Sequence, residues 1–324
     1  CGLSPKRSGA PISRLNFIRR PAPMPHEQMF SNRQGQHDRP QTEARPVTAP
    51  RSQKTIGLTL AIFGALLLTP DTLFMRLSQL DGFNMLLWRG GLSGLAYFVI
   101  WLWMRGPRDL SNIWTRNFAI IVACQTGNAA LFSLAIALAP VTVVLIGVAT
   151  VPIFAALLSR LLLGEALSMR TLITAAMVFL GLFISVLGSD DGHLMLDLTT
   201  LIGAGLGLGV AFSLAMNFTI IRKDTDVPFV LAIAVGAIAA AGLAAVFVTT
   251  LAWPPLPQMA AIALTGIFIL PLSFVTLSYA ARFVPSSTVS LIMLLETVLG
   301  PLWVWWGIDE APSAMMLIGG GIVL

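Results

Sequence analysis

Two charged residues lie inside long apolar stretches of the sequence, where a charge needs a physical reason. Glu296 lies near the centre of the stretch 285–308, and Arg89 lies inside the stretch 83–104. Placing a charged side chain in hydrocarbon costs about 2.5–3.5 kcal/mol on insertion scales. Glu296 is predicted to bind a proton or a cation, or alternatively to be a neutral or paired side chain that joins two helices. Arg89 is predicted to bind an anionic substrate group or to pair with Glu296, and the alternative is a side chain that snorkels to the interface.

Asp71 follows a proline in the outer part of the apolar stretch 56–75. A proline kinks a helix and frees a backbone carbonyl, so the adjacent carboxylate could hold a cation there. The favoured interpretation is nevertheless a frayed helix end close to Arg76. Asn217 lies 146 positions after Asp71 and is polar at a matching depth in its own apolar stretch.

A polar patch lies inside a third apolar stretch, at Gln125, Thr126 and Asn128. Amides and hydroxyls in such a position either hydrogen-bond a neighbouring helix or line a wet cavity. Gln125, Asn128 and Asn217 are therefore candidates for binding a substrate or an ion, together with Arg89, Glu296 and Asp71.

The sequence contains no pattern typical of an enzyme active site. Its three histidines are His26 and His37 near the N-terminus and His193 in a polar loop, and its two cysteines are far apart. No Ser/His/Asp set or metal-ligand cluster falls within the apolar stretches. We therefore predict no catalytic residue, no metal site and no cofactor, and a membrane-embedded enzyme is disfavoured.

Composition and length indicate a membrane protein. The chain is 56% hydrophobic and 11% charged, whereas soluble domains carry about 25% charged residues. Ten apolar spans are predicted by length and flanking charges: 56–75, 83–104, 117–137, 140–163, 170–188, 199–221, 229–252, 258–280, 285–308 and 313 onward. The last span holds only twelve residues, too few to cross a bilayer, and is expected to be truncated here.

Residues 1–55 differ from the rest of the chain, with ten Lys and Arg against three acidic residues. They show no apolar period and are predicted to form a disordered basic tail. Nucleic-acid binding and an organelle transit peptide are the weaker alternatives. Because Lys and Arg accumulate in cytoplasmic loops, the tail is placed in the cytoplasm, and eight further arginines and lysines of the chain then fall on the same side.

The pattern of residue types in 140–168 recurs 145 positions later. Each copy has a proline, an apolar span, a glutamate and a serine in the same order, at Pro140, Glu165 and Ser168 and at Pro285, Glu310 and Ser313. The glutamates and the helix-capping serines are predicted to be structural. The repeat predicts two homologous halves, 56–188 and 199–324. Since each half holds five spans, an odd number, the two halves must enter the membrane from opposite sides as an inverted repeat.

Residues 133–173 and 278–324 resemble the signature of EamA-type members of the drug/metabolite transporter superfamily. Both have an Ala-containing helix end, a Pro turn, a long helix, and an acidic pair or Gly-Glu before a Ser, and Trp88-Arg89 resembles the Arg usual in the family's second helix. The sequence departs from the pattern at Asp309, where the family has Gly. The resemblance implies an all-α fold of ten transmembrane helices in two inverted five-helix repeats, a central cavity, and export or exchange of small metabolites.

These features together predict a multi-pass secondary transporter of the plasma (bacterial inner) membrane, working by alternating access. The substrate is amino acid-like, nucleoside-like or drug-like, and proton coupling through Glu296 is the favoured energy source because no nucleotide-binding motif is present. The alternative is a non-transporting scaffold or receptor on the same fold. The expected partners are a small-molecule substrate and the lipid bilayer but no nucleic acid, and a homodimer remains open.

Overall fold

The structure, a computed structural model, describes residues 51–104, 112–139, 141–165 and 198–309, with a few single positions between them. The chain divides into two compact units, Cys1–Thr48 and Ala49–Leu324, and every helix below belongs to the second unit. Several predictions fall outside the described residues: most of the tail, nearly all of the fifth span, the tenth span, and the motif residues Pro140, Ser168, Glu310 and Ser313.

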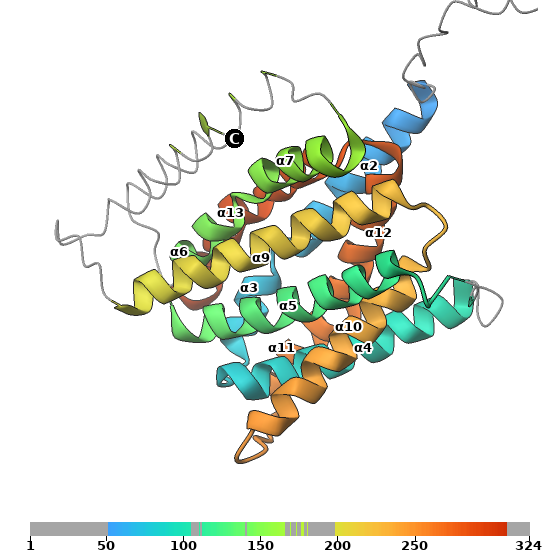
Figure 1. The fold of residues 1–324 in the computed structure, drawn as a ribbon. Helices are drawn as coiled ribbons and strands as arrows, with labels where there is room; N and C mark the ends of the chain where they lie inside the picture. The colour runs from blue at the N-terminus through green and yellow to red at the C-terminus, as the bar shows by residue number, and fades with distance from the viewer. Residues whose placement is uncertain are drawn as a thin grey trace, which may run out of the picture. The chain divides into compact units, whose positions relative to one another are not determined.

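The described residues are helical and contain no strand (Figure 1). The helices are α2 (Arg51–Leu68), α3 (Asp71–Leu77), α4 (Gly82–Met104), α5 (Arg116–Leu138), α6 (Val141–Val148), α7 (Val151–Leu163), α9 (Leu198–Lys223), α10 (Phe229–Phe247), α11 (Leu256–Leu264), the π-helix η2 (Thr265–Ile269), α12 (Leu270–Phe283) and α13 (Ser286–Ile308). By length and composition, seven of the described segments could cross a membrane. Every predicted span within the described residues is therefore helical over most of its length, although the span 229–252 is helical only to Phe247. Helix α2 begins at Arg51, before the predicted boundary at 56, because apolar content marks only the part of a helix that lies in hydrocarbon.

Three of the predicted spans are interrupted. The first breaks at Thr69 and Pro70 into α2 and α3, and the fourth breaks at Ala149 and Thr150 into α6 and α7. Pro70 has no N–H to donate to the preceding turn, and this ends α2. The eighth span contains η2 between α11 and α12, and such π-helical turns are frequent at functional sites. The sequence predicted the spans and a kink at Pro70, but not the interruptions in the fourth and eighth spans.

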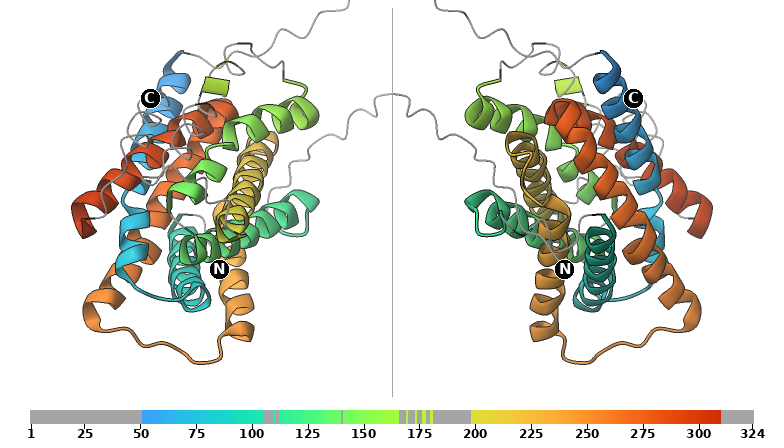
Figure 2. Two further views of the ribbon diagram at one scale, coloured as in Figure 1. Left: turned by 90° about the vertical axis from the view of Figure 1, so that its left-hand side faces the viewer. Right: turned by 90° about the vertical axis from the view of Figure 1, so that its right-hand side faces the viewer.

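Helices that are far apart in the sequence pack side by side in the second unit. α4 packs on α10, α5 on α9, and α2 on α12, while α13 contacts both α7 and α2. Figures 1 and 2 both show the α10–α11 connection at the end of the helices opposite to the start of α2. The buried hydrophobic core runs through these contacts and includes side chains from both predicted halves.

Hydrogen bonds between side chains and backbone groups hold the start of helix α4 in place. Asp81 Oδ1 accepts hydrogen bonds from the backbone N–H of Phe83 and of Asn84, at 3.1 and 3.0 Å. Burial acts to raise the pKa of Asp81, but the hydrogen bonds from Asn84 and Phe83 outweigh it and hold that pKa below its ordinary value. Asn84 also donates to Thr250 O and accepts from Ala252 N, which ties the start of α4 to the α10–α11 connection.

Helices α6 and α9 approach each other backbone to backbone. A Cβ atom added to Gly207 would lie 2.6 Å from the carbonyl oxygen of Val144 and 3.0 Å from Cα of Gly147. Such a contact cannot relax by side-chain rotation, because the opposing atoms belong to backbone. Small residues at this spacing let membrane helices pack closely.

Gly207→Ala is therefore expected to lower the melting temperature of the detergent-purified protein. Gly205→Ala is the matched control on the same helix, because a Cβ at Gly205 would meet nothing within 4 Å. Alanine is favoured over glycine by about 1 kcal/mol in a helix, so the control is expected to melt at the same temperature as the original protein or above it. Equal melting temperatures for the two variants would contradict the close approach.

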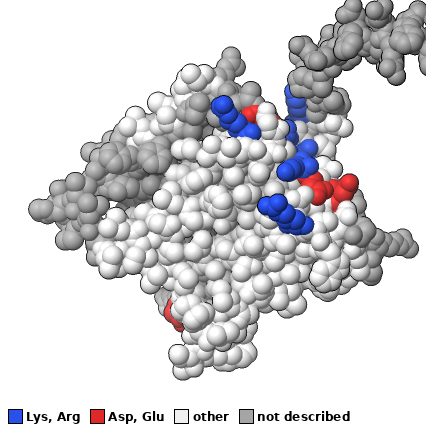
Figure 3. All heavy atoms as spheres, in the orientation of Figure 1, with Lys and Arg blue, Asp and Glu red and all other residues white. Residues whose placement is uncertain are grey.

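The charged side chains are unevenly distributed over the helices. Figure 3 shows Lys and Arg gathered over one end of the structure, where α9 ends and α2 begins. At this end Arg222 of α9 binds Glu165, just beyond α7, with Nη2 and Oε1 2.9 Å apart. Arg282 lies over the ring of Phe229, 4.7 Å from its centroid.

Candidate functional site

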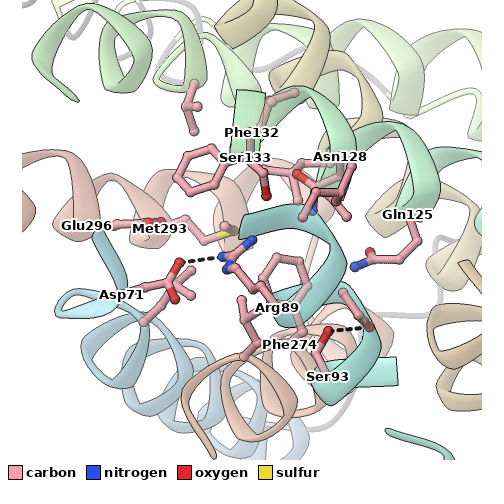
Figure 4. Close-up of a pocket in the computed structure, with 18 residues that line it drawn as sticks. Asp71, Arg89, Ser93, Gln125, Asn128, Phe132, Ser133, Phe274, Met293 and Glu296 are labelled. Carbon is pink, nitrogen blue, oxygen red and sulfur yellow. Dashed lines mark hydrogen bonds and ion pairs between the residues drawn. The ribbon is translucent and has the colours of Figure 1, made fainter. Parts of the chain in front are cut away.

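A pocket with about 540 Å³ of space free of protein atoms, open solvent included, lies among the helices. Its walls come from both predicted halves of the chain, and the side chains that carry charges or hydrogen-bonding groups are labelled in Figure 4. The polar and charged lining residues are Asp71, Arg89, Ser93, Gln125, Asn128, Ser133 and Glu296; the apolar ones include Leu68, Leu86, Phe132, Val148, Leu214, Phe274 and Met293.

The strongest interaction in the pocket joins Arg89 of α4 to Asp71 of α3. Arg89 Nη2 donates to Asp71 Oδ2 at 2.5 Å, and both side chains are buried, 6% and 1% exposed. Arg89 also lies over the ring of Phe132, 5.4 Å from its centroid. The preferred interpretation of Asp71 as a frayed helix end near Arg76 is wrong, because Asp71 is buried and Arg76 instead donates to Ala139 O.

The same contact corrects the prediction for Arg89. The residue does not snorkel to the surface, since its side chain is buried, and its ion pair is formed with Asp71 and not with Glu296. The break after α2 explains the choice: Pro70 lies at the N-cap of α3 and Asp71 in the first turn, which turns the carboxylate towards α4.

Two close contacts position Arg89. A Cβ added to Gly90 would lie 3.1 Å from Ala237 O of α10, and one added to Gly266 of η2 would lie 3.3 Å from Arg89 O. Both glycines allow α4 to sit close between α10 and η2. The π-helix is further held by Tyr97, whose hydroxyl donates to Leu270 O at 2.9 Å.

Glu296 of α13 faces the same pocket and is 5% exposed. Among the described residues it forms no hydrogen bond and no ion pair. The charged groups that act on it are Asp71 of α3 and Arg89 of α4. Of the two alternatives from the sequence, a carboxyl that pairs two helices finds no partner here, and a carboxyl open to the pocket fits the geometry.

The amides lie towards the opposite side of the pocket from Glu296 (Figure 4). Gln125 and Asn128 of α5 both line it and are 5% and 8% exposed. Asn217 of α9 does not line it but donates from Nδ2 to Gln125 Oε1 at 3.3 Å, so it orients the glutamine. Thr126 turns away and donates to Gly236 O of α10, which is the interhelical contact expected as an alternative.

Sequence reasoning missed the apolar walls of the pocket. Phe132, Phe274 and Met293 line it, yet each is one of many apolar residues in its span, and no spacing distinguishes them from core residues. No tryptophan is among the described residues that line the pocket. Trp305 and Trp306 are 45% and 79% exposed, in keeping with positions that face lipid or the interface.

Two residues of the repeated motif, Pro285 and Glu165, lie at the ends of helices. Pro285 is the N-cap of α13, and Glu165 follows Gly164, which ends α7 in the left-handed conformation at φ 68°. Glycine adopts that conformation without strain. Glu165 is held by Arg222, as described above, and lies outside the pocket.

Comparison with known proteins shows what part of this chain is similar to. Residues 51–187 match the family model described as the EamA-like transporter family. Together with the seven apolar helices of the described residues, the match supports a multi-pass membrane transporter of the drug/metabolite transporter type. The resemblance noted in the sequence is confirmed over these residues. The members of that family are transporters and not enzymes, which fits the prediction made from the sequence.

The fold is found in solved structures as well. A structure titled "Crystal structure of protein" matches with a TM-score of 0.66 at 20% sequence identity, covering 85% of this chain and 94% of that chain. At this identity the likeness concerns the fold alone. No curated protein matches the chain.

Proposed function

We propose that the protein is a secondary transporter that moves small metabolites across the plasma (bacterial inner) membrane by alternating access through this pocket. The observation that carries the proposal is the burial of three charged side chains, Asp71, Arg89 and Glu296, around one cavity among apolar helices. Ionisable residues inside a membrane are expensive and usually mark a substrate or ion pathway.

The packing of the helices supports an inverted repeat. At the 145-residue offset, α2 corresponds to α9 and α5 to the segment of α11, η2 and α12. The contact of α2 with α12 is then the counterpart of the contact of α9 with α5, and α4 packs on its own counterpart α10. Two halves related in this way, 56–188 and 199–324, would place the substrate between them and open it alternately to each side.

The charge distribution supports a cytoplasmic N-terminus. The Lys and Arg side chains visible in Figure 3 gather at the end where α2 begins, and Lys and Arg are retained on the cytoplasmic side. We infer that this end, including the loop between α9 and α10, faces the cytoplasm.

Proton coupling is proposed for Glu296. A carboxyl that lines a cavity and lacks a partner can hold a proton in one state of the cycle and release it in another. The energy of the proton gradient would then drive the substrate, which agrees with a sequence that contains no nucleotide-binding motif.

The test is flux of a panel of radiolabelled metabolites in right-side-out and inside-out vesicles. The original protein is expected to move at least one compound, and Arg89→Ala and Glu296→Gln are expected to lose that flux while remaining inserted. Glu165→Gln is the matched control, since it removes a carboxylate outside the pocket. Absence of flux for every compound, despite correct insertion, would favour the alternative of a scaffold or receptor.

A further inference from the structure

Among the described residues that line the pocket, acidic groups outnumber basic groups by one. Its lining includes two carboxyl groups, Asp71 and Glu296, and one guanidinium group, Arg89. With all three ionised the lining carries one net negative charge. Because the walls are otherwise apolar or neutral, this charge is weakly screened by solvent and bears on what the pocket can hold.

Arg89 already pairs with one carboxylate of the pocket. Its Nη2 donates to Asp71 and its planar group lies over Phe132, while its Nε is buried without a hydrogen-bond partner. A substrate anion that displaced Asp71 would leave a buried carboxylate without its partner, which is strongly unfavourable. Asp71 already has spare acceptor capacity, since its Oδ1 is buried and forms no hydrogen bond.

Glu296 is the charged residue of the pocket that is unpaired. It is buried and has no hydrogen-bond or ion-pair partner among the described residues. A carboxylate in such a place must either hold a proton or bind a cation, because an isolated buried charge is too costly. Figure 4 shows Asp71 and Glu296 on the same side of the pocket, so their negative fields add at one place.

The remaining walls suit an uncharged organic body. Phe132, Phe274 and Met293 are apolar, and aromatic faces also attract alkylammonium groups. The amides of Gln125 and Asn128 lie on the side away from Glu296 and could hydrogen-bond a neutral polar group. The pocket is thus acidic on one side, neutral and polar on the other, and apolar between.

We propose that the substrate of this pocket is an organic monocation, a protonated amine or a quaternary ammonium on an apolar or aromatic body, and not an organic anion. The assignment deepens the proposed transport function and rests on it for the direction of movement. When the cation binds, the carboxyl of Glu296 gives one proton to solvent and its carboxylate faces the ammonium group. Proton and cation therefore occupy Glu296 in turn, with Asp71 and Arg89 as the other charged groups that act on it.

The test is binding of four matched probes to the full chain purified in detergent micelles. Phenethylamine, phenylalanine, 3-phenylpropionate and 2-phenylethanol share a phenethyl skeleton and present it as a cation, a zwitterion, an anion and a neutral molecule. The amine is expected to bind at least tenfold more tightly than the anion and the zwitterion, to release about one proton on binding, and to bind more weakly as the pH falls. Glu296→Gln is expected to lose at least tenfold in amine affinity, while Glu165→Gln is expected to keep it.

The outcomes separate this assignment from the transport proposal. Tighter binding of the anion or the zwitterion, equal binding of all four probes, or binding of none would overturn the assignment. Flux of phenyltrimethylammonium in proteoliposomes is then measured, because a permanent cation does not cross lipid unaided. Preferential amine binding that depends on Glu296, without any flux, would support the cation site and contradict transport. Saturable flux of 3-phenylpropionate without flux of phenyltrimethylammonium would support transport and contradict the cation site.

Discussion

Replacing Arg89 by leucine is expected to destabilise the folded protein by about 3–5 kcal/mol, the usual cost of removing one partner of a buried ion pair. The pair is almost completely enclosed, with Arg89 and Asp71 side chains 6% and 1% exposed. Without the guanidinium group, Asp71 would keep two buried oxygens with no partner, because Oδ1 has none already. The loss should appear as a lower midpoint in denaturant or heat.

A double-mutant cycle measures the coupling. Asp71→Leu is expected to destabilise the protein by a similar amount, and the double variant Asp71→Leu/Arg89→Leu is expected to be closer to the original protein than either single variant, since no unpaired charge remains. Arg222→Leu is the control, because its pair with Glu165 is partly exposed, at 23% and 35%, and such pairs contribute about 0–1 kcal/mol. Additive effects of the two single substitutions would show that the pair does not hold α3 to α4.

Glu296→Gln is expected to abolish the response of transport to a pH gradient. If one proton leaves Glu296 for each cation bound, each unit of pH difference is equivalent to about 1.36 kcal/mol and supports a tenfold accumulation of substrate. Glutamine has nearly the same shape but cannot release a proton, so the accumulation ratio should fall to unity. Any residual downhill movement is expected to be equally fast with and without the gradient.

The measurement uses proteoliposomes loaded with phenyltrimethylammonium, with the external pH set one unit below the internal pH and then one unit above it. The rate of efflux is expected to rise in the orientation in which protons flow inwards, and to respond in the original protein and in Glu165→Gln alike. An unchanged pH response in Glu296→Gln would remove Glu296 from the coupling mechanism, even if the cation site is correct.

Hydropathy alone placed the helices well. The spans around Arg89 and Gln125 match α4 and α5 to within a residue at each end, since a helix in hydrocarbon must be apolar along its whole length and this is a local property. A kink at Pro70 was predicted from the sequence, but the interruptions at Thr150 and in η2 were not. Membrane helices accommodate proline without breaking whenever neighbouring helices satisfy the freed backbone groups, and those neighbours are a matter of packing.

The sequence alone marked Glu296 and Arg89 as candidate functional residues, because the free-energy cost of placing a charge in hydrocarbon can be judged from the apolar residues around it in one span. Which partners they have depends on the packing of helices from both halves of the sequence. The fold pairs Arg89 with Asp71 across the break after α2, turns Thr126 to α10 while Gln125 stays in the pocket, and leaves Glu296 without a partner among the described residues. Contacts of this kind depend on how helices pack and where they bend, and the apolar pattern of a single span predicts neither.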